Sequence, residues 1–172
     1  MRKNIVKNHT FFLFYVTLIT MSVLIFSSCS DKENKDSNHI VQLTNPNTFI
    51  LKTNDRSYNI GIEKKNISIA SVFQPIILLN IFKPNCTSCL LHTQTLKSLE
   101  DDYNIAVINI AKSTQDKENI NFVNEIYATL GITKDALNIL SVLYINGTYY
   151  QHYEGLTPIE MVEHDIPSNN IK

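Results

Sequence analysis

A Cys-x-x-Cys motif directly after an apolar run constrains this chain more than any other feature. The run Ile76–Phe82 is almost continuously apolar, which is typical of a central strand buried on both faces. Pro84 ends the run, and Cys86 and Cys89 follow at once, where a helix is expected to begin. Cysteines at positions i and i+3 of a helix have side-chain origins about 5–6 Å apart, so a disulfide between them is geometrically accessible.

This placement of two cysteines suits thiol–disulfide exchange. The first-turn amides and the positive end of the expected helix would stabilise a thiolate on Cys86, the cysteine nearer the helix terminus. We therefore predict that Cys86 is the nucleophile and Cys89 the resolving cysteine, with Thr87 and Ser88 as the intervening residues of the redox motif.

The N-terminus has the pattern of a secretory signal. Arg2, Lys3 and Lys7 precede an uncharged, mainly apolar stretch over residues 11–26, and small residues follow at 27 and 28. The stretch is shorter than the roughly 20 apolar residues of a spanning helix and contains polar residues. We predict a signal peptide over residues 1–28, with an uncleaved membrane anchor as the alternative.

Cys29 ends a segment, Ile-Phe-Ser-Ser-Cys, that resembles a bacterial lipoprotein signal. The resemblance implies that Cys29 becomes the lipid-bearing first residue of the mature chain; the alternative is an ordinary cysteine in a discarded leader. Residues 31–38 contain no apolar residue, so residues 29–39 are predicted to be the lipidated cysteine and a polar tether. Residues 40–172 then form one domain, which is long enough to bury a single core.

Charge gives no indication of a nucleic-acid partner. The formal net charge is −1, and no basic run occurs outside the leader. The charged residues between 31 and 36 mix both signs, which is typical of a solvated spacer.

The rest of the domain alternates between strand and helix patterns. Strands are predicted at residues 49–53 and 58–62 as a hairpin, at 104–111, and at 140–145 and 148–153 around the turn residues Asn146 and Gly147. Helices are predicted at residues 87–102, at 116–130 before Gly131, and at 158–164 with Thr157 as the N-cap. This order predicts an α/β fold in which helices flank a mixed central sheet.

These residues resemble the thioredoxin superfamily over residues 48–166. The resemblance rests on the strand entering Cys86-Thr-Ser-Cys89, on leucines 96 and 99 in the next helix, and on the late Ile-Asn-Gly-Thr hairpin. Phe82 stands where the family usually has an aromatic residue. Gly155 and the Thr-Pro-Ile-Glu segment at 157–160 resemble the family's entry into its final helix. The resemblance implies a thioredoxin-like fold with an N-terminal β-hairpin extension.

The chain also departs from the family pattern at two supporting positions. Asn80 stands where thioredoxin has a buried acid, and an amide cannot act as a general base for Cys89. We therefore expect Asn80 to be a neutral, hydrogen-bonded strand residue. Ile139 or Leu140 occupies the position of the family's cis-proline. Because a non-proline cis bond costs about 2.5–4 kcal/mol, a trans bond is expected there.

The resemblance to membrane-tethered bacterial reductases implies a function in the cell envelope. Such an enzyme needs no cofactor, faces the periplasm from a lipid anchor in either membrane, and draws electrons from a membrane donor. Its expected partners are disulfide-bearing exported proteins, for example apocytochromes c.

Two other functions use the same cysteines. A copper-handling protein would bind Cu(I) through Cys86, Cys89 and His92, because soft thiolates suit that ion. His92, as a single helix histidine, is nevertheless expected to be exposed. A non-enzymatic lipoprotein would hold the pair as a static disulfide, although so short a loop gains little stability from cross-linking.

Overall fold

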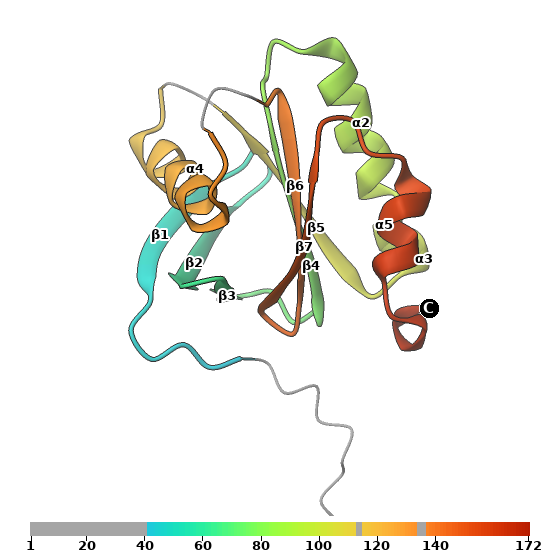
Figure 1. Cartoon of the computed structure of the whole chain (residues 1–172), viewed down its shortest axis with the longest axis horizontal. Coiled ribbons are helices and arrows are strands. Elements are labelled where there is room, and N and C mark those ends of the chain that lie inside the picture. The colour runs from blue at the N-terminus through green and yellow to red at the C-terminus, as the bar shows by residue number, and fades with distance from the viewer. Residues whose placement is uncertain (1–40, 113–114, 134–136) are drawn as a thin grey trace, which may run out of the picture. The chain divides into compact units, whose positions relative to one another are not determined.

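A seven-stranded mixed sheet forms the centre of the domain in the computed structural model, which describes residues 41–112, 115–133 and 137–172 (Figure 1). Strands follow the order β1-β2-β3-β7-β6-β4-β5. The predicted signal peptide, Cys29 and the polar tether lie outside the described residues. Within the described part of the chain, no helix has the length and apolar character needed to cross a membrane.

The apolar run before the cysteines is the central strand β4 (Ile76–Phe82), and every one of its residues is buried. It pairs in parallel with β5 (Ile105–Ala111) and antiparallel with β6 (Ile139–Ile145). The next strand, β7 (Thr148–Glu154), returns antiparallel to β6. The prediction of a mixed sheet is thus confirmed, with β4 buried on both faces as its composition indicates.

The N-terminal extension has one strand more than the predicted hairpin. Strands β1 (Asn47–Lys52) and β2 (Ser57–Glu63) pair as expected, and β3 (Asn66–Ile69) then pairs with β2. The β3 strand joins the rest of the sheet through a single residue pair with β7, Asn66 with Thr148. The sequence of β3, Asn-Ile-Ser-Ile, alternates between polar and apolar residues, but at four residues it is at the lower limit of that signal, and the sequence analysis did not identify it.

The predicted helix over residues 87–102 is divided in two. Helix α2 (Thr87–Lys97) ends at Ser98, whose hydroxyl donates to the carbonyl of Thr95, and α3 (Leu99–Asp102) follows. Side-chain hydrogen bonds from serine to a preceding carbonyl compete with a continuous helical ladder.

Local signals fix two of the other turns. Helix α4 (Lys117–Leu130) has Asp116 as its N-cap and ends at Gly131, which has a φ of 72°. The β6–β7 turn places Asn146 and Gly147 at φ values of 52° and 80°, the geometry that Asn-Gly favours.

The last helix begins one residue later than predicted. Helix α5 (Ile159–Asp165) has Pro158 at its N-cap, so the prediction of Thr157 there is wrong. The Thr157 hydroxyl donates instead to the carbonyl of Gly155, and a short 3₁₀ turn, η1 (Ser168–Asn170), follows α5.

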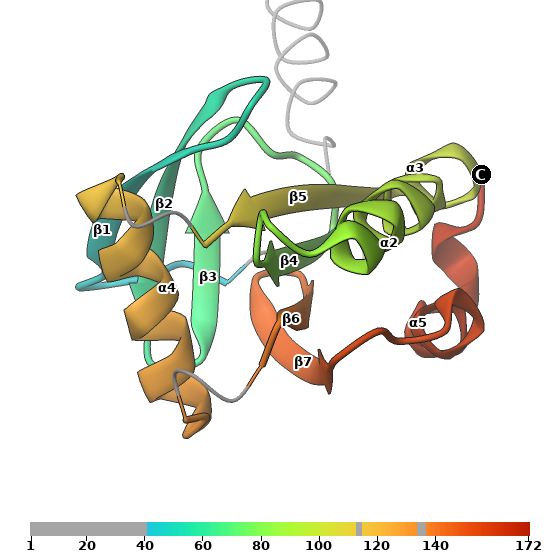
Figure 2. The same cartoon turned by 90° about the horizontal axis from the view of Figure 1, so that it is seen from above.

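Helices cover both faces of the central strands. Figure 2 shows α4 on one side, and α2, α3 and α5 on the other. The α4 side is one continuous apolar cluster, whereas the α2 side contains two separate clusters. The larger α2-side cluster lies under the second half of α2 and under α5, and the smaller one consists of Phe82, Cys89 and Ile139 with Cys86 and Ala111 against it.

Candidate redox site

Cys86 and Cys89 lie at the junction between β4 and α2, as the sequence predicts. A turn over residues 83–86 connects the two elements, in which the Cys86 amide donates to the carbonyl of Lys83 at 3.3 Å. The Lys83 amide donates to the carbonyl of Asn138 at 2.9 Å, which ties the turn to the segment before β6. The two cysteines form a disulfide across a Cα–Cα distance of 5.2 Å.

Cys86 is the N-cap of α2, and its sulfur performs the capping. The Cys89 amide donates to the Cys86 sulfur at 3.2 Å, and the Ser88 hydroxyl lies 3.3 Å from the same sulfur. A disulfide sulfur carries no proton, so the hydroxyl is the donor. The first turn of α2 has no acidic residue. The same two donors and the helix end would stabilise a negative charge on Cys86 after reduction.

The two sulfurs differ in access. Cys86 is half-buried at the surface, whereas Cys89 is only 1% exposed and packs against Phe82 and Ile139. The Cys89 sulfur lies 3.9 Å from the carbonyl oxygen of Asn138, which can accept the S–H of the reduced cysteine. An attacking partner therefore reaches Cys86 first, and Cys89 is sheltered behind it.

Asn80 is a neutral, hydrogen-bonded residue of β4, as predicted. Its side chain is fully buried; the amide nitrogen donates to Asn109 at 2.8 Å, and the Ser141 hydroxyl donates to its oxygen at 3.1 Å. Asn109 and Ser141 occupy the same register on the strands to either side. We call these three residues the polar layer. The sequence alone did not identify Asn109 or Ser141, because their pairing with Asn80 depends on strand register.

His92 is buried, and the expectation of an exposed residue is wrong. Its exposed fraction is 8%, and its Nε2 atom is buried without a hydrogen-bond partner. Burial lowers the pKa of the imidazole from its usual value. Three of the four buried residues of helix α2 are polar or sulfur-containing, so the hydrophobic pattern of the helix does not distinguish its buried side from its exposed side. The four residues are Cys89, His92, Thr93 and Leu96.

The three-residue copper site is not assembled. Among the described residues, no group of three or more histidine, cysteine, aspartate or glutamate side chains is arranged to hold a metal ion. His92 therefore does not join the two cysteines as a third ligand in this structure.

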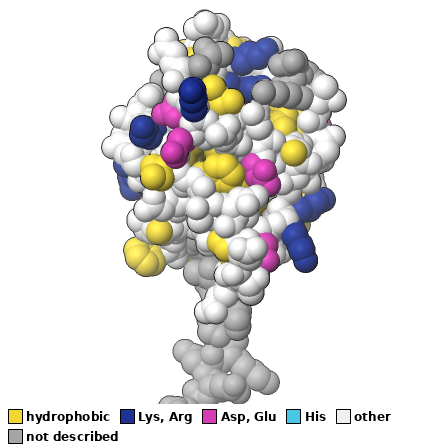
Figure 3. Space-filling model, turned by 90° about the vertical axis from the view of Figure 1, so that its left-hand side faces the viewer, with side chains coloured by type: hydrophobic (Ala, Val, Ile, Leu, Met, Phe, Trp, Pro, Cys, Tyr) yellow, Lys and Arg dark blue, Asp and Glu magenta, His cyan; other side chains and the backbone are white. Residues whose placement is uncertain are grey.

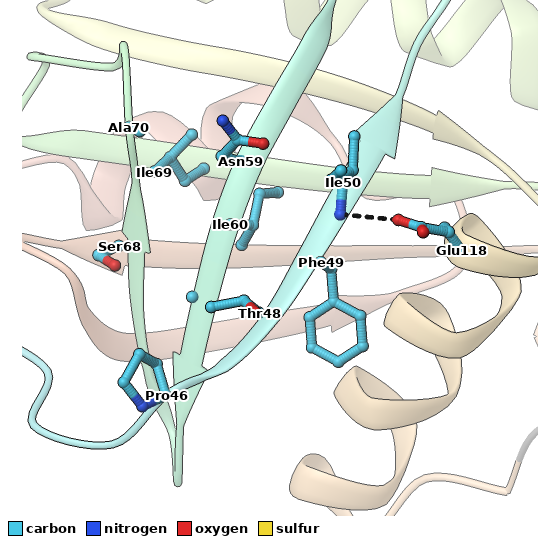
Figure 4. A pocket seen from close by; sticks show the side chains of 11 residues that line it. Pro46, Thr48, Phe49, Ile50, Asn59, Ile60, Ser68, Ile69, Ala70 and Glu118 are labelled. Atoms are coloured by element: carbon cyan, nitrogen blue, oxygen red, sulfur yellow. Dashed lines mark hydrogen bonds between the residues drawn. The ribbon is translucent and has the colours of Figure 1, made fainter.

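A separate groove of about 670 Å³ lies on the outer face of the N-terminal strands (Figure 4). It is lined by residues of β1, β2 and β3, by Pro46 and Ala70 next to these strands, and by Glu118, which accepts a hydrogen bond from the Ile50 amide at 3.0 Å. None of the predicted site residues lines this groove. Figure 3 shows the molecule from the left-hand side of Figure 1, where basic, acidic and apolar side chains are interspersed.

Comparisons with known proteins give similarity in structure only. No family model and no curated protein sequence matches the chain. Among solved structures, a thioredoxin variant from Halobacterium salinarum has 16% identity and a TM-score of 0.42. The match covers 55% of this chain and 74% of the thioredoxin chain. The oxidised thioredoxin O2 of Arabidopsis thaliana has 10% identity and a TM-score of 0.42, and the match covers 53% of this chain and 72% of the thioredoxin chain. These values are too low to carry an argument about fold or activity.

The fold is decided by the topology of the chain itself. Strands β4 and β5 are parallel around α2, β6 and β7 are antiparallel after α4, and α5 closes the unit beside α2, with strand order β7-β6-β4-β5. The cysteine pair occupies the end of β4 and the first turn of α2. The chain has a thioredoxin-like fold. The fold and the Cys86–Cys89 pair together support a thiol–disulfide oxidoreductase.

The position of the usual cis-proline in the thioredoxin-like fold is held by Ile139. The described residues contain no cis peptide bond, in agreement with the expected trans geometry. Ile139 packs against Cys89, whereas Leu140 points to the α4 side of the sheet and joins the core there. Of the two residues predicted for this position, only Ile139 belongs to the site.

Three exposed leucines belong to the segments that form the rim of the site. Leu90 and Leu91 follow Cys89 on α2, and Leu91 is 61% exposed. Leu156 is 54% exposed and follows Gly155, whose amide donates to the carbonyl of Ile139 at 3.0 Å. The sequence analysis did not single out these residues, because an isolated surface leucine is common in any protein.

Proposed function

We propose that this protein is an envelope thiol–disulfide oxidoreductase that reduces disulfides of exported proteins. The observation that carries the proposal is the asymmetry of the two sulfurs: Cys86 is accessible and capped by two hydrogen-bond donors, and Cys89 is buried within disulfide distance of it. This asymmetry matches the two roles of nucleophile and resolving thiol.

In the proposed reaction, the Cys86 thiolate attacks one sulfur of a substrate disulfide. A mixed disulfide forms between Cys86 and the substrate, and the other substrate sulfur leaves as a thiolate. Cys89 then attacks the Cys86 sulfur, and the second substrate thiol leaves. Two electrons pass from the protein dithiol to the substrate, and the protein ends with the Cys86–Cys89 disulfide.

The location and partners belong to the same proposal. Cys29 would carry the lipid anchor, the residues after it would be the tether, and the domain would face the periplasm. A membrane electron donor would return the disulfide to the dithiol, and apocytochromes c are an example of the proposed substrates. The N-terminal signal pattern supports this location.

Trapping with cysteine variants tests the enzymatic part. The full chain in detergent is reduced and mixed with a disulfide-bonded peptide, and the products are alkylated and weighed by mass spectrometry. Cys89→Ser should accumulate a mixed disulfide at Cys86, whereas Cys86→Ser should form none and the wild type should release two thiols. Absence of a mixed disulfide in Cys89→Ser would contradict the proposal.

Metabolic labelling tests the anchor. Cells producing the full chain are grown with labelled palmitate, and the protein is isolated. We expect label in the wild type and none in Cys29→Ala, with Cys86→Ala as the matched control that keeps the label. Label that persists in Cys29→Ala would refute the lipid anchor.

A further inference from the structure

The polar layer separates the two apolar clusters on the α2 side of the sheet. Above it, Phe82 and Ile139 pack against Cys89, and below it the larger cluster contains Leu78, Val107 and Leu143 of the same three strands. Residues on one face of a strand alternate with a period of two, so Asn80, Asn109 and Ser141 form the row between these clusters. Apolar residues would pack at least as well in this row, so packing alone does not explain why it is polar.

Helix α2 crosses this row at its middle. Cys89 belongs to the upper cluster and Leu96 to the lower one. The buried residues between them on α2 are His92 and Thr93, which places them over the polar layer. Side chains of a helix lean toward its N-terminus, so the imidazole of His92 leans back toward the turn that contains Cys89.

His92 differs from its buried polar neighbours because its Nε2 atom has no hydrogen-bond partner. The Thr93 hydroxyl donates to the carbonyl of Leu90, and the members of the polar layer bond to one another. The Nε2 atom of His92 is buried and unpaired. A buried polar atom without a partner is costly, and its retention calls for an explanation in function.

Among the described residues, Tyr103 and Tyr153 also lie on the α2 side of the sheet, with the larger cluster, and the Tyr153 hydroxyl donates to Asp165 at 2.6 Å. Strands β4, β5 and β6 bring no titratable side chain to the α2 side of the sheet. Burial is the cause of the lowered pKa of His92, and no charged neighbour contributes to it. None of the charged or titratable side chains along the second half of α2 and on α3 and α5 contributes to the lowered pKa of His92. These are Lys97, Glu100, Asp101, Asp102, Glu160, Glu163, His164 and Asp165.

We propose that His92 is the proton acceptor for Cys89 in the resolving step, in the place of the acid that Asn80 does not supply. This inference rests on the proposed oxidoreductase function. The Cys89 S–H bond breaks and its proton passes to Nε2, directly after the ring turns or through one water molecule. The Cys89 thiolate forms a bond to the Cys86 sulfur, the mixed-disulfide bond breaks, and the leaving substrate thiolate takes up a proton.

The neutral state of His92 is what this role requires. A lowered pKa keeps the buried imidazole unprotonated, and therefore able to accept a proton, at neutral pH. Below that pKa, protonated His92 no longer accepts a proton from Cys89. The rate of the resolving step should therefore fall as the imidazole becomes protonated.

Single-turnover kinetics on the reduced full chain in detergent test this assignment. With excess disulfide peptide, the first thiol released reports attack by Cys86 and the second reports resolution by Cys89. His92→Gln should leave the attack rate within about twofold of the wild type and slow resolution at least about tenfold at pH 7. It should also abolish the imidazole inflection in the pH profile of resolution. Thr93→Val, the adjacent buried variant, should resolve like the wild type.

Rescue separates a proton acceptor from a packing residue. Asn80→Asp places a carboxylate in the polar layer, so adding it to His92→Gln should restore most of the resolution rate. Resolution by His92→Gln within twofold of the wild type at every pH, or failure of Asn80→Asp to restore a slowed rate, would overturn the assignment. Failure of the oxidoreductase function itself is distinct, because Cys89→Ser would then form no mixed disulfide.

A titration of the imidazole gives a readout without turnover. Nuclear magnetic resonance of histidine-labelled protein should show a higher His92 pKa in the dithiol form than in the disulfide form, because a thiolate nearby favours the imidazolium. Equal pKa values in the two forms would contradict a shared proton. Thr93→Val again serves as the control, with the same difference as the wild type.

Discussion

The two faces of the central sheet are built on different principles, although the same strands form both. The α4 face is one unbroken apolar cluster, which contains Leu140, Val142 and Phe122. The α2 face is interrupted by the polar layer, with Cys89 on one side of it and Leu96 on the other. The α4 face contributes stability through apolar burial, whereas the α2 face gives up part of that burial to hold polar groups near the cysteines. Both faces thus contribute to stability, whereas the redox chemistry belongs to the α2 face alone.

Adjacent residues of β6 give the largest test of this division. Leu140 faces α4 and Ile139 faces Cys89, and both are almost fully buried. Leu140→Ala and Ile139→Ala should each lower the free energy of unfolding by about 2–5 kcal/mol, because each leaves a cavity. Urea unfolding measures the loss, and exchange with a disulfide peptide measures activity.

The two variants should separate in activity. Ile139→Ala should change the exchange rate, because Ile139 shelters Cys89, and Leu140→Ala should leave the rate per folded molecule unchanged. Equal effects on exchange would show that the two faces are not independent.

Ser141→Ala tests the polar layer with a smaller effect. The substitution removes the hydroxyl that donates to the Asn80 side-chain oxygen and leaves that buried oxygen unpaired. We expect a loss of about 1–3 kcal/mol in the free energy of unfolding, measured in urea. Val142→Ala, at the next residue and on the opposite face, provides the apolar comparison. A neutral Ser141→Ala would mean that the layer contributes no hydrogen-bond energy.

A cap on the α4 face should affect stability alone. The Asp116 side chain accepts from the amides of Glu118 and Asn119 at the start of α4. Asp116→Ala should cost about 0.5–2 kcal/mol in thermal or urea unfolding, with unchanged exchange kinetics. Slower exchange in this variant would connect α4 to the redox site.

The smallest predicted effect is the pH dependence that arises from His92. Its pKa is lowered in the folded protein, so the unfolded chain binds a proton first as the pH falls. The free energy of unfolding should therefore decrease as the pH falls through about 6.5, the pKa of an unperturbed histidine. Unfolding in urea at several pH values checks this, and His92→Gln should show a smaller decrease than the wild type. Identical pH profiles would place the histidine in the same environment in both states.

The sequence predicted those parts of the fold that local patterns specify. The apolar run of β4, the C-terminal glycine of α4 and the Asn146-Gly147 turn each act through neighbouring residues, and all three are confirmed. The cysteine pair was located for the same reason. Asn80 was correctly predicted to be hydrogen-bonded, but its partners come from two other strands and depend on register.

The errors occurred where patterns are ambiguous. Helix α2 carries polar residues on every side, so its sequence did not show that His92 is buried. Strand β6 is apolar on both faces, so alternation did not separate Ile139 from Leu140. The Ser98 hydroxyl bonds to the carbonyl of Thr95 where the predicted long helix divides. At α5, Pro158 occupies the N-cap without a side-chain hydrogen bond, and the Thr157 hydroxyl bonds to the carbonyl of Gly155 instead.

The redox equilibrium of the Cys86–Cys89 pair tests the central claim most directly. The full chain in detergent is equilibrated with glutathione or dithiothreitol buffers of known potential, and the alkylated dithiol and disulfide forms are quantified by mass spectrometry. A reductase should show reversible exchange with a potential between about −270 and −200 mV, the range from thioredoxin to the glutaredoxins. A disulfide that resists reduction below about −300 mV and exchanges with no peptide would be a static cross-link, and would contradict the account.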